Sequence, residues 1–253
     1  MSLLAFQRAM ADLAASPALR ARVRDDAESA LAPYTLTDLE RRRLASAAGQ
    51  PGMRVNGMLY RSNRLGPIAA QLPYSFVLIG PALRGLMDAY WERHPGFERN
   101  APLEVRRFAD FLRERMEAGD VAEPLLREVL DWEMLVYELA LLPPERTLAQ
   151  VADAAANARA DGPLRPHPLV GVTPFSVDPR ALLPHLFAKR RPPYDDVEEG
   201  EHHLLVDLRG ARRAFVPLDP SIAAAFHAVR DGGWVDQADA EMLIELGIVV
   251  AGE

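Results

Sequence analysis

Apolar residues in the first 142 positions recur every three or four residues, which predicts a series of amphipathic helices beginning with Leu3–Ala14. Ser16 and Pro17 end this first helix, and Pro17 suits the first turn of the next. Thr37 and Glu40 have the spacing of a capping box and predict another helix start. Further helices are expected over 55–71, 76–90, 103–116 and 125–142, with 76–90 as the central buried helix and Gly80-Pro81 interrupting its start.

The pattern changes after Pro144, where prolines become frequent and apolar residues alternate with polar ones. Residues Leu169–Val177 predict a strand, and its proline indicates a place at a sheet edge because proline cannot donate to a ladder. A short helix is expected over Ala181–Phe187. We therefore expect a helical domain over 1–142, a linker with strand and loop segments over 143–200, and a small domain over 201–253.

The last fifty residues have the order hairpin, helix, helix, strand. Two alternating runs flank a turn at Arg209–Gly210 and predict the hairpin. A helix from Pro220 ends at Gly232–Gly233, where glycine can take the left-handed cap, and a second short helix ends at Gly247. This order is that of a small winged-helix module. The predicted fold is a mainly α N-terminal domain with a small α+β, winged-helix-like C-terminal domain.

The composition is that of an ordinary globular chain, with 49% apolar and 26% charged residues. No apolar run is long enough for a transmembrane helix, and the N-terminus lacks the segments of a signal peptide. The absence of cysteine excludes disulfides, thiolate zinc sites and a cysteine nucleophile. We therefore expect a cytoplasmic protein with no membrane partner.

Candidate catalytic groups are few. His202 and His203 stand beside glutamates, but neighbours on a strand point to opposite faces, so a metal site is not predicted. His94 and His167 lie at turns without a recognisable partner. Glu133 is an acid flanked by apolar residues, and a structural ion pair with an arginine such as Arg61 or Arg64 is favoured over catalysis. We expect no catalytic residue, metal or cofactor; the alternative is an enzyme that uses Glu133 and a loop histidine.

The charge of the C-terminal module helps to decide between two possible ligands, nucleic acid and an extended peptide. From Glu199 onward the chain has ten acidic and four basic residues, and the whole chain has a net charge of −7. A DNA-reading helix needs basic or amide side chains, whereas the second helix has three acids and no base, which makes nucleic acid unlikely. Only the hairpin tip, with Arg209, Arg212 and Arg213, offers phosphate contacts.

An extended peptide needs an open strand edge and apolar surface beside it. The hairpin strand over 213–218 and the second helix have both features. By alternation and helical phase, Ala214, Val216, Met242 and Glu245 are the stronger candidates. The full set of predicted peptide-binding residues is Ala214, Phe215, Val216, Leu218, Met242 and Glu245, of which Leu218 is also expected in the module's core.

Short motifs run through this C-terminal part: Leu204-Leu205-Val206-Asp207, Arg209-Gly210, Phe215, Leu218-Asp219, Ile222-Ala223, Asp231-Gly232, Leu243 and Leu246-Gly247-Ile248. Together they resemble the PqqD-like recognition elements of ribosomal-peptide (RiPP) maturation. The resemblance implies a winged helix that binds the leader of a precursor peptide as an added strand.

Motifs of the helical part have a second likeness: Tyr60-Arg61-Ser62-Asn63-Arg64, Leu72-Pro73-Tyr74, Leu78-Ile79-Gly80, Ala89-Tyr90, Phe108-Ala109-Asp110-Phe111-Leu112 and Leu130-Asp131-Trp132-Glu133. They resemble the accessory subunits (MbnC/TglI-type) of multinuclear non-haem iron oxidases in RiPP biosynthesis. This implies a non-catalytic subunit that presents the precursor peptide to an oxidase, the partner that holds the iron. The implied partner interface comprises Tyr60, Asn63, Arg64, Tyr74, Trp132 and Glu133. The alternative function is a winged-helix DNA-binding transcriptional regulator.

Overall fold

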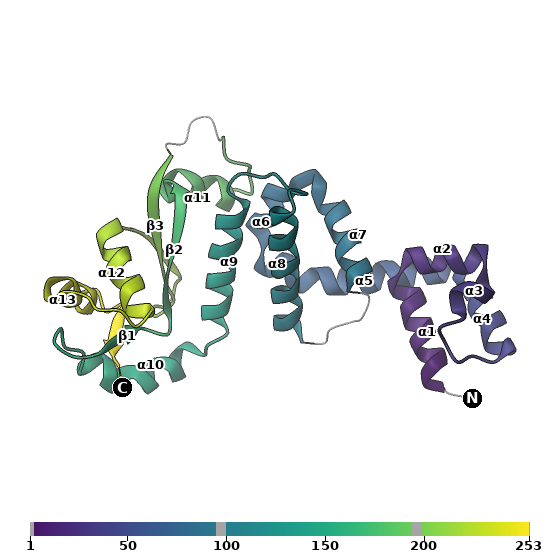
Figure 1. The fold of residues 1–253 in the computed structure, drawn as a ribbon, viewed down its shortest axis with the longest axis horizontal. Coiled ribbons are helices and arrows are strands. Elements are labelled where there is room, and N and C mark those ends of the chain that lie inside the picture. Colours follow the sequence, from purple (N-terminus) through teal and green to yellow (C-terminus); the bar gives the residue numbers. More distant parts are fainter. Residues whose placement is uncertain (1–2, 95–99, 194–198, 253) are drawn as a thin grey trace. The chain divides into compact units, whose positions relative to one another are not determined.

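The computed structural model describes residues 3–94, 100–193 and 199–252. It is mostly helical, with a small antiparallel sheet region near the C-terminus, which confirms the predicted fold class at this level (Figure 1). Contacts divide the chain into two units, one formed by Met1–Gln71 with Gly80–Glu117 and the other by Leu72–Ile79 with Ala118–Glu253. The predicted division into 1–142, 143–200 and 201–253 has other boundaries than these two units, and it stays a prediction.

The first unit is helical throughout its described residues. Ser16 caps the second helix by accepting from the backbone N–H of Leu19, and Thr37 and Glu40 form the predicted capping box. The helices are α1 (Leu3–Ala15), α2 (Pro17–Asp25), α3 (Ala27–Leu31), α4 (Asp38–Ala48), α5 (Pro51–Gln71), α7 (Leu83–Arg93) and α8 (Ala101–Glu117), with a 3-10 turn, η1 (Gly80–Ala82), before α7.

Helix α5 has one face against α1 and another in solvent. At Gly57 an added Cβ would lie 2.8 Å from the carbonyl oxygen of Ala14, so only glycine allows this close approach. On the exposed side, Val55, Met58 and Leu59 are 52%, 65% and 57% exposed. These three residues, at helical spacing, form what we call the α5 stripe.

The expectation of a central buried helix over 76–90 was wrong, whereas the interruption expected at Gly80-Pro81 is present. The segment forms α6 (Pro73–Ile79), η1 and then α7, and α6 belongs to the second unit whereas α7 belongs to the first. Gly80 has a φ of +52°, which ends the helix, and Pro81 has no N–H with which to continue it.

Within the described residues no single helix is long and apolar enough to cross a membrane, and one pair, Pro51–Gln71 with Pro73–Arg93, meets the length and composition criteria only when its 104° bend is accepted.

The second unit combines a three-stranded antiparallel sheet, in the order β2-β3-β4, with a separate antiparallel pair, β1 and β5. Its helix α10 was not predicted, because the apolar residues of that segment are mostly alanine and only Thr147 and Val151 are buried. The elements besides α6 are α9 (Leu126–Ala140), α10 (Pro144–Ala156), β1 (Leu164–Pro166), β2 (Val170–Val177), α11 (Pro179–Phe187), β3 (Glu199–Asp207), β4 (Ala214–Leu218), α12 (Pro220–Arg230), α13 (Gln237–Glu245) and β5 (Val249–Ala251).

Helices cover both faces of the three-stranded sheet (Figure 1). On one face Val172 and Leu205 form a core with Phe226 of α12. On the other face α9 approaches β2 closely, since an added Cβ at Gly171 would lie 2.6 Å from a methyl group of Leu135. Because side chains alternate along a strand, each strand of the sheet contributes to two different cores.

Candidate functional site

The outer edge of β4 is the candidate site. In the sheet order β4 is terminal, and its only strand partner in the part of the chain that is described is β3. The N–H of Leu208 donates to the carbonyl of Leu169 at 2.9 Å, so even-numbered residues of β3 direct their backbone groups toward β2 and odd-numbered ones toward β4.

The register then fixes which backbone groups of β4 are free. Ala214, Val216 and Leu218 lie opposite odd-numbered residues of β3 and use their backbone groups in that ladder. Phe215 and Pro217 therefore direct theirs away from the sheet. Pro217 has no N–H, so the open edge of β4 offers the N–H of Phe215 and the carbonyls of both residues.

The predicted peptide-binding side chains lie on two faces of this edge. Ala214, Val216 and Leu218 share the face that α12 covers, and Leu218 is half-buried against its core, as expected. Val216 is 45% exposed and Met242 on α13 is 42% exposed, while Glu245 is fully on the surface. Val216 therefore adds exposed apolar surface beside the open backbone on this face, and Met242 adds it on α13, which packs against α12.

Phe215 lies on the opposite face, inside an aromatic cluster. Its ring is 5.3 Å from that of Trp132 in an edge-to-face arrangement and 6.2 Å from that of Phe187. Tyr74 stacks on Trp132 at 5.4 Å. Trp132 is buried, whereas Phe187 is 48% exposed and Tyr74 and Phe215 are partly exposed. We call Tyr74, Phe187 and Phe215, which surround Trp132, the aromatic shelf.

Sequence reasoning missed Phe187, and the only signal for it was an apolar residue at the end of a short helix before a basic run. Burial and the charge of Glu133 raise the pKa of Tyr74, and Arg213, which precedes β4 near this shelf, opposes that shift. The shelf therefore combines aromatic rings with a nearby positive charge.

Arg209 fixes the hairpin turn to the end of α13. Its guanidinium pairs with Asp207 at 2.7 Å and donates to the carbonyls of Leu246 and Gly247. These carbonyls lie at a helix C-terminus, where a cation is favoured. Arg209 was expected as a possible phosphate contact, and the structure gives it this internal role instead, while Arg212 and Arg213 are exposed.

Glu133 is buried beneath the same region and serves as a helix cap. Its carboxylate accepts from the N–H of Tyr74 at 2.7 Å, and from the N–H and hydroxyl of Ser75 at 2.9 and 2.5 Å, at the start of α6. Burial raises the pKa of Glu133 to about 7, against the opposing effect of these three donors. The expectation of an arginine partner for this acid was wrong.

The two arginines considered as partners of Glu133 pair with other acidic residues. Arg61 pairs with Asp88 at 2.8 Å. Arg64 is buried, pairs with Glu104 at 2.6 Å and also donates to the backbone carbonyl of His94. This buried pair joins α5 to α8, and breaking one partner would leave an uncompensated buried charge.

The predicted partner interface divides between the two units. Tyr60, Asn63 and Arg64 come from α5, and Tyr74, Trp132 and Glu133 come from the second unit. Arg64, Trp132 and Glu133 are at most 3% exposed, so their side chains have internal structural roles. Tyr60, Asn63 and Tyr74 have surface to offer a partner.

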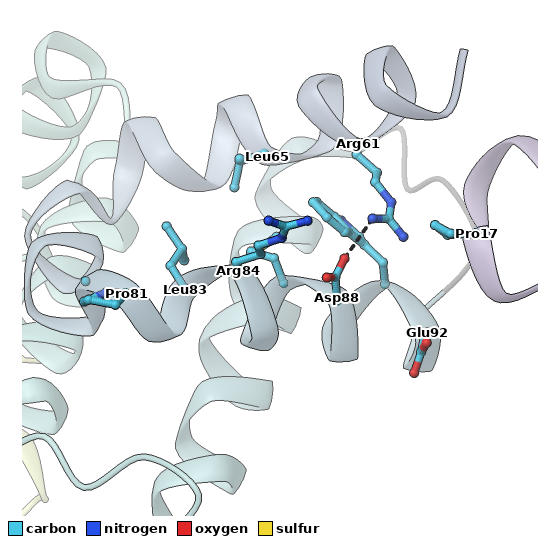
Figure 2. Close-up of a pocket in the computed structure, with 11 residues that line it drawn as sticks. Pro17, Arg61, Leu65, Pro81, Leu83, Arg84, Asp88 and Glu92 are labelled. Carbon is cyan, nitrogen blue, oxygen red and sulfur yellow. Dashed lines mark hydrogen bonds and ion pairs between the residues drawn. The ribbon is translucent and has the colours of Figure 1, made fainter. Parts of the chain in front are cut away.

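A hollow of about 740 Å³ lies between α5 and α7 in the first unit. Figure 2 shows Arg61 reaching from α5 to Asp88 on α7, with Arg84 extending into the space between the helices. The Arg61 guanidinium also lies 4.5 Å from the centre of the Trp91 ring. Because Arg61 and Asp88 pair with each other, neither is free to act on a ligand, whereas Arg84 and Glu92 also line the hollow.

No metal-binding cluster of three or more suitable side chains occurs among residues 3–94, 100–193 and 199–252. His203 is buried on the α12 side with its ring 6.0 Å from that of His227, while its neighbour His202 lies opposite Phe175 on the other face. The two histidines therefore point apart, as expected. His167 accepts from the N–H of Leu169 in a turn.

Neither the protein-family models nor the curated proteins contain a match to this chain.

Proposed function

We propose that β4 binds an extended peptide as a fourth strand of the sheet. The open backbone of Phe215 and Pro217 carries this proposal, because such an edge is a template for strand addition. Each hydrogen bond made there contributes roughly 0.5–1.5 kcal/mol, so affinity depends also on side chains next to the strand. Val216 and Met242 provide exposed apolar surface, and Glu245 favours a peptide with basic residues.

The hairpin β3–β4 with α12 and α13 is, in this proposal, a winged-helix-like recognition element for the leader of a RiPP precursor. The whole chain is a non-catalytic subunit that presents the precursor to a multinuclear iron oxidase, which supplies the iron and the chemistry. The support is the resemblance of the motifs together with the internal roles of Glu133 and His167, the acid and one of the loop histidines considered for an enzyme.

For the oxidase we propose the α5 stripe as the docking surface. Val55, Met58 and Leu59 are more than half exposed, and Asn63 continues the same side of the helix. Co-expression with an oxidase encoded beside this chain should give a complex that co-elutes. Changing Met58 and Leu59 to serine should abolish co-elution without changing the thermal midpoint, and unchanged co-elution would remove the stripe from the proposal.

The alternative, a DNA-binding regulator, rests on the exposed Arg212 and Arg213 at the hairpin tip. The acids of α13 oppose it, and Arg209 is occupied at the C-terminal end of that helix. Duplex binding that weakens steeply with salt would favour the regulator, whereas no binding at low salt would exclude it.

Strand addition is tested by two variants at one position. Phe215→Ala keeps the outward N–H, and Phe215→Pro removes it without touching the ladder to β3. With a fluorescent peptide from the precursor encoded nearby, we expect Phe215→Pro to bind about two- to tenfold more weakly than Phe215→Ala. Equal affinities, with urea midpoints showing that both variants fold, would contradict strand addition at this edge.

A further inference from the structure

We propose that the aromatic shelf is a specificity site for an aromatic side chain of the peptide. The inference rests on the proposed addition of a strand to β4 and concerns the face of the sheet opposite α12. Tyr74, Phe187 and Phe215 all have exposed surface there, above the buried ring of Trp132. The site is therefore a partly exposed group of rings around a buried one, next to the β4 strand.

Strand geometry brings peptide side chains to this face. Residues directly opposite each other in paired strands place their side chains on the same face. A peptide residue opposite Phe215 would therefore direct its side chain toward the shelf, and its two neighbours would face Val216 and the α12 side. One peptide would be recognised by two different surfaces at alternate positions.

The chemistry of the shelf favours an aromatic ring over an aliphatic chain. The rings already present adopt stacked, edge-to-face and tilted arrangements, with centroids 5.3 to 6.2 Å apart. A further ring can continue this arrangement and gains from the complementary charges of ring faces and edges. Phe187, nearly half exposed at the end of α11, is the ring with the most surface left to cover.

The opposite face has different requirements. Val216 on the α12 side is apolar and exposed, and α13, which packs against α12, carries the exposed residues Met242, Glu241 and Glu245. Lysine suits this surface, because its apolar stem covers aliphatic groups while its charge meets the acids. The expected peptide pattern is therefore an aromatic residue in alternation with basic or aliphatic ones.

Two synthetic peptides of about eight residues test this pattern. In the first, lysine and phenylalanine alternate; in the second, leucine replaces every phenylalanine. Titrated against the full chain, the phenylalanine peptide should bind about fivefold more tightly than the leucine peptide. Phe187→Ala should reduce this ratio to about one, because the ring that distinguishes the peptides is gone.

Met242→Ala is the matched control on the other face, since both side chains are partly exposed and neither belongs to the β3–β4 ladder. It should weaken both peptides and leave their ratio unchanged. If both peptides bind the unmodified chain equally, or if the ratio survives Phe187→Ala, the shelf is not the specificity site, and strand addition still stands. If neither peptide binds, the proposed function and the shelf are both wrong.

Discussion

The two edges of the β2-β3-β4 sheet differ in the backbone groups they leave free. Both carry a proline, Pro174 in β2 and Pro217 in β4. At the β2 edge, however, the N–H of Val170 donates to the carbonyl of His167, and that of Ser176 donates to Glu128 of α9. The N–H of Val172 also faces away from β3, but this residue is only 7% exposed. At the β4 edge the N–H of Phe215 has no acceptor within the described residues.

This difference between the edges shows that one proline is not enough to satisfy or remove all the outward backbone groups of an edge strand. Proline protects an edge by removing one donor, and further protection must come from turns or from side chains of packed elements. Helix α9 makes different contacts at the two edges. Its Glu128 accepts the hydrogen bond from an outward N–H of β2. Its Trp132 and Glu133 instead contact residues of the aromatic shelf beside β4. The open edge of β4 thus lies next to a surface, the aromatic shelf, that could bind side chains of an added peptide strand.

The largest effect is expected from proline on the inner side of β4. Val216→Pro removes a ladder bond to Leu205 and should lower the free energy of unfolding by about 3 kcal/mol. Phe215→Pro, whose N–H faces outward, should cost clearly less than Val216→Pro in a urea titration. If the two variants lose equal stability, the assignment of inner and outer positions is wrong.

The next effect concerns the acid beneath the shelf. The folded-state pKa of Glu133, about 7, lies above its ordinary value, so the fold favours the protonated acid. This stabilisation is complete below about pH 4.5 and is lost as pH rises through about 7, on the order of 3 kcal/mol in total. Urea unfolding near pH 5 and near pH 8 measures it.

Glu133→Gln provides the control for that titration, because an amide has no charge to gain. The variant loses part of the cap at Tyr74 and Ser75, so its stability should be lower near pH 5 than that of the unmodified chain. Its stability should change less over the same pH interval. A pH dependence equal to that of the unmodified chain would assign the effect to other groups.

A smaller and opposite effect is expected at Pro217. Pro217→Ala adds an N–H to the open edge and should tighten peptide binding about two- to tenfold. The ladder to β3 does not use this position, so the urea midpoint should hardly move. Unchanged affinity would mean that the peptide does not reach this end of β4.

The smallest effect is expected at the closed edge. Glu128→Ala frees the N–H of Ser176 and should reduce the free energy of unfolding by less than about 1 kcal/mol, because the bond is exposed. Peptide affinity should stay the same, measured with the peptide used at β4. A gain in binding would show that β2 can also accept a strand, which would remove the contrast between the edges.

Local signals in the sequence predicted local structure well. The capping box at Thr37 and Glu40, the helix stop at Gly232 and the edge position of the strand with Pro174 each depend on neighbouring residues, and all are present. The interruption of 76–90 at Gly80-Pro81 was predicted as well, but not that α6 and α7 belong to different units, because the apolar pattern does not show which unit each residue serves.

The candidate site was only partly predictable for a similar reason. Alternation placed Val216 and Leu218 on one face of β4, but what Phe215 meets on the other face depends on segments distant in sequence. No local pattern brings Trp132 and Phe187 to that ring, nor does one show that Arg209 reaches the end of α13.

The most direct test of strand addition is residue-resolved amide hydrogen exchange, with and without the lysine–phenylalanine peptide. In the free chain we expect fast exchange at Phe215 and slow exchange at Val216 and Ser176, whose N–H groups are bonded. The peptide should slow exchange at Phe215 and leave the other two unchanged. Protection of Phe215 in the free chain, or no change there when the peptide binds, would contradict an open β4 edge that accepts a strand.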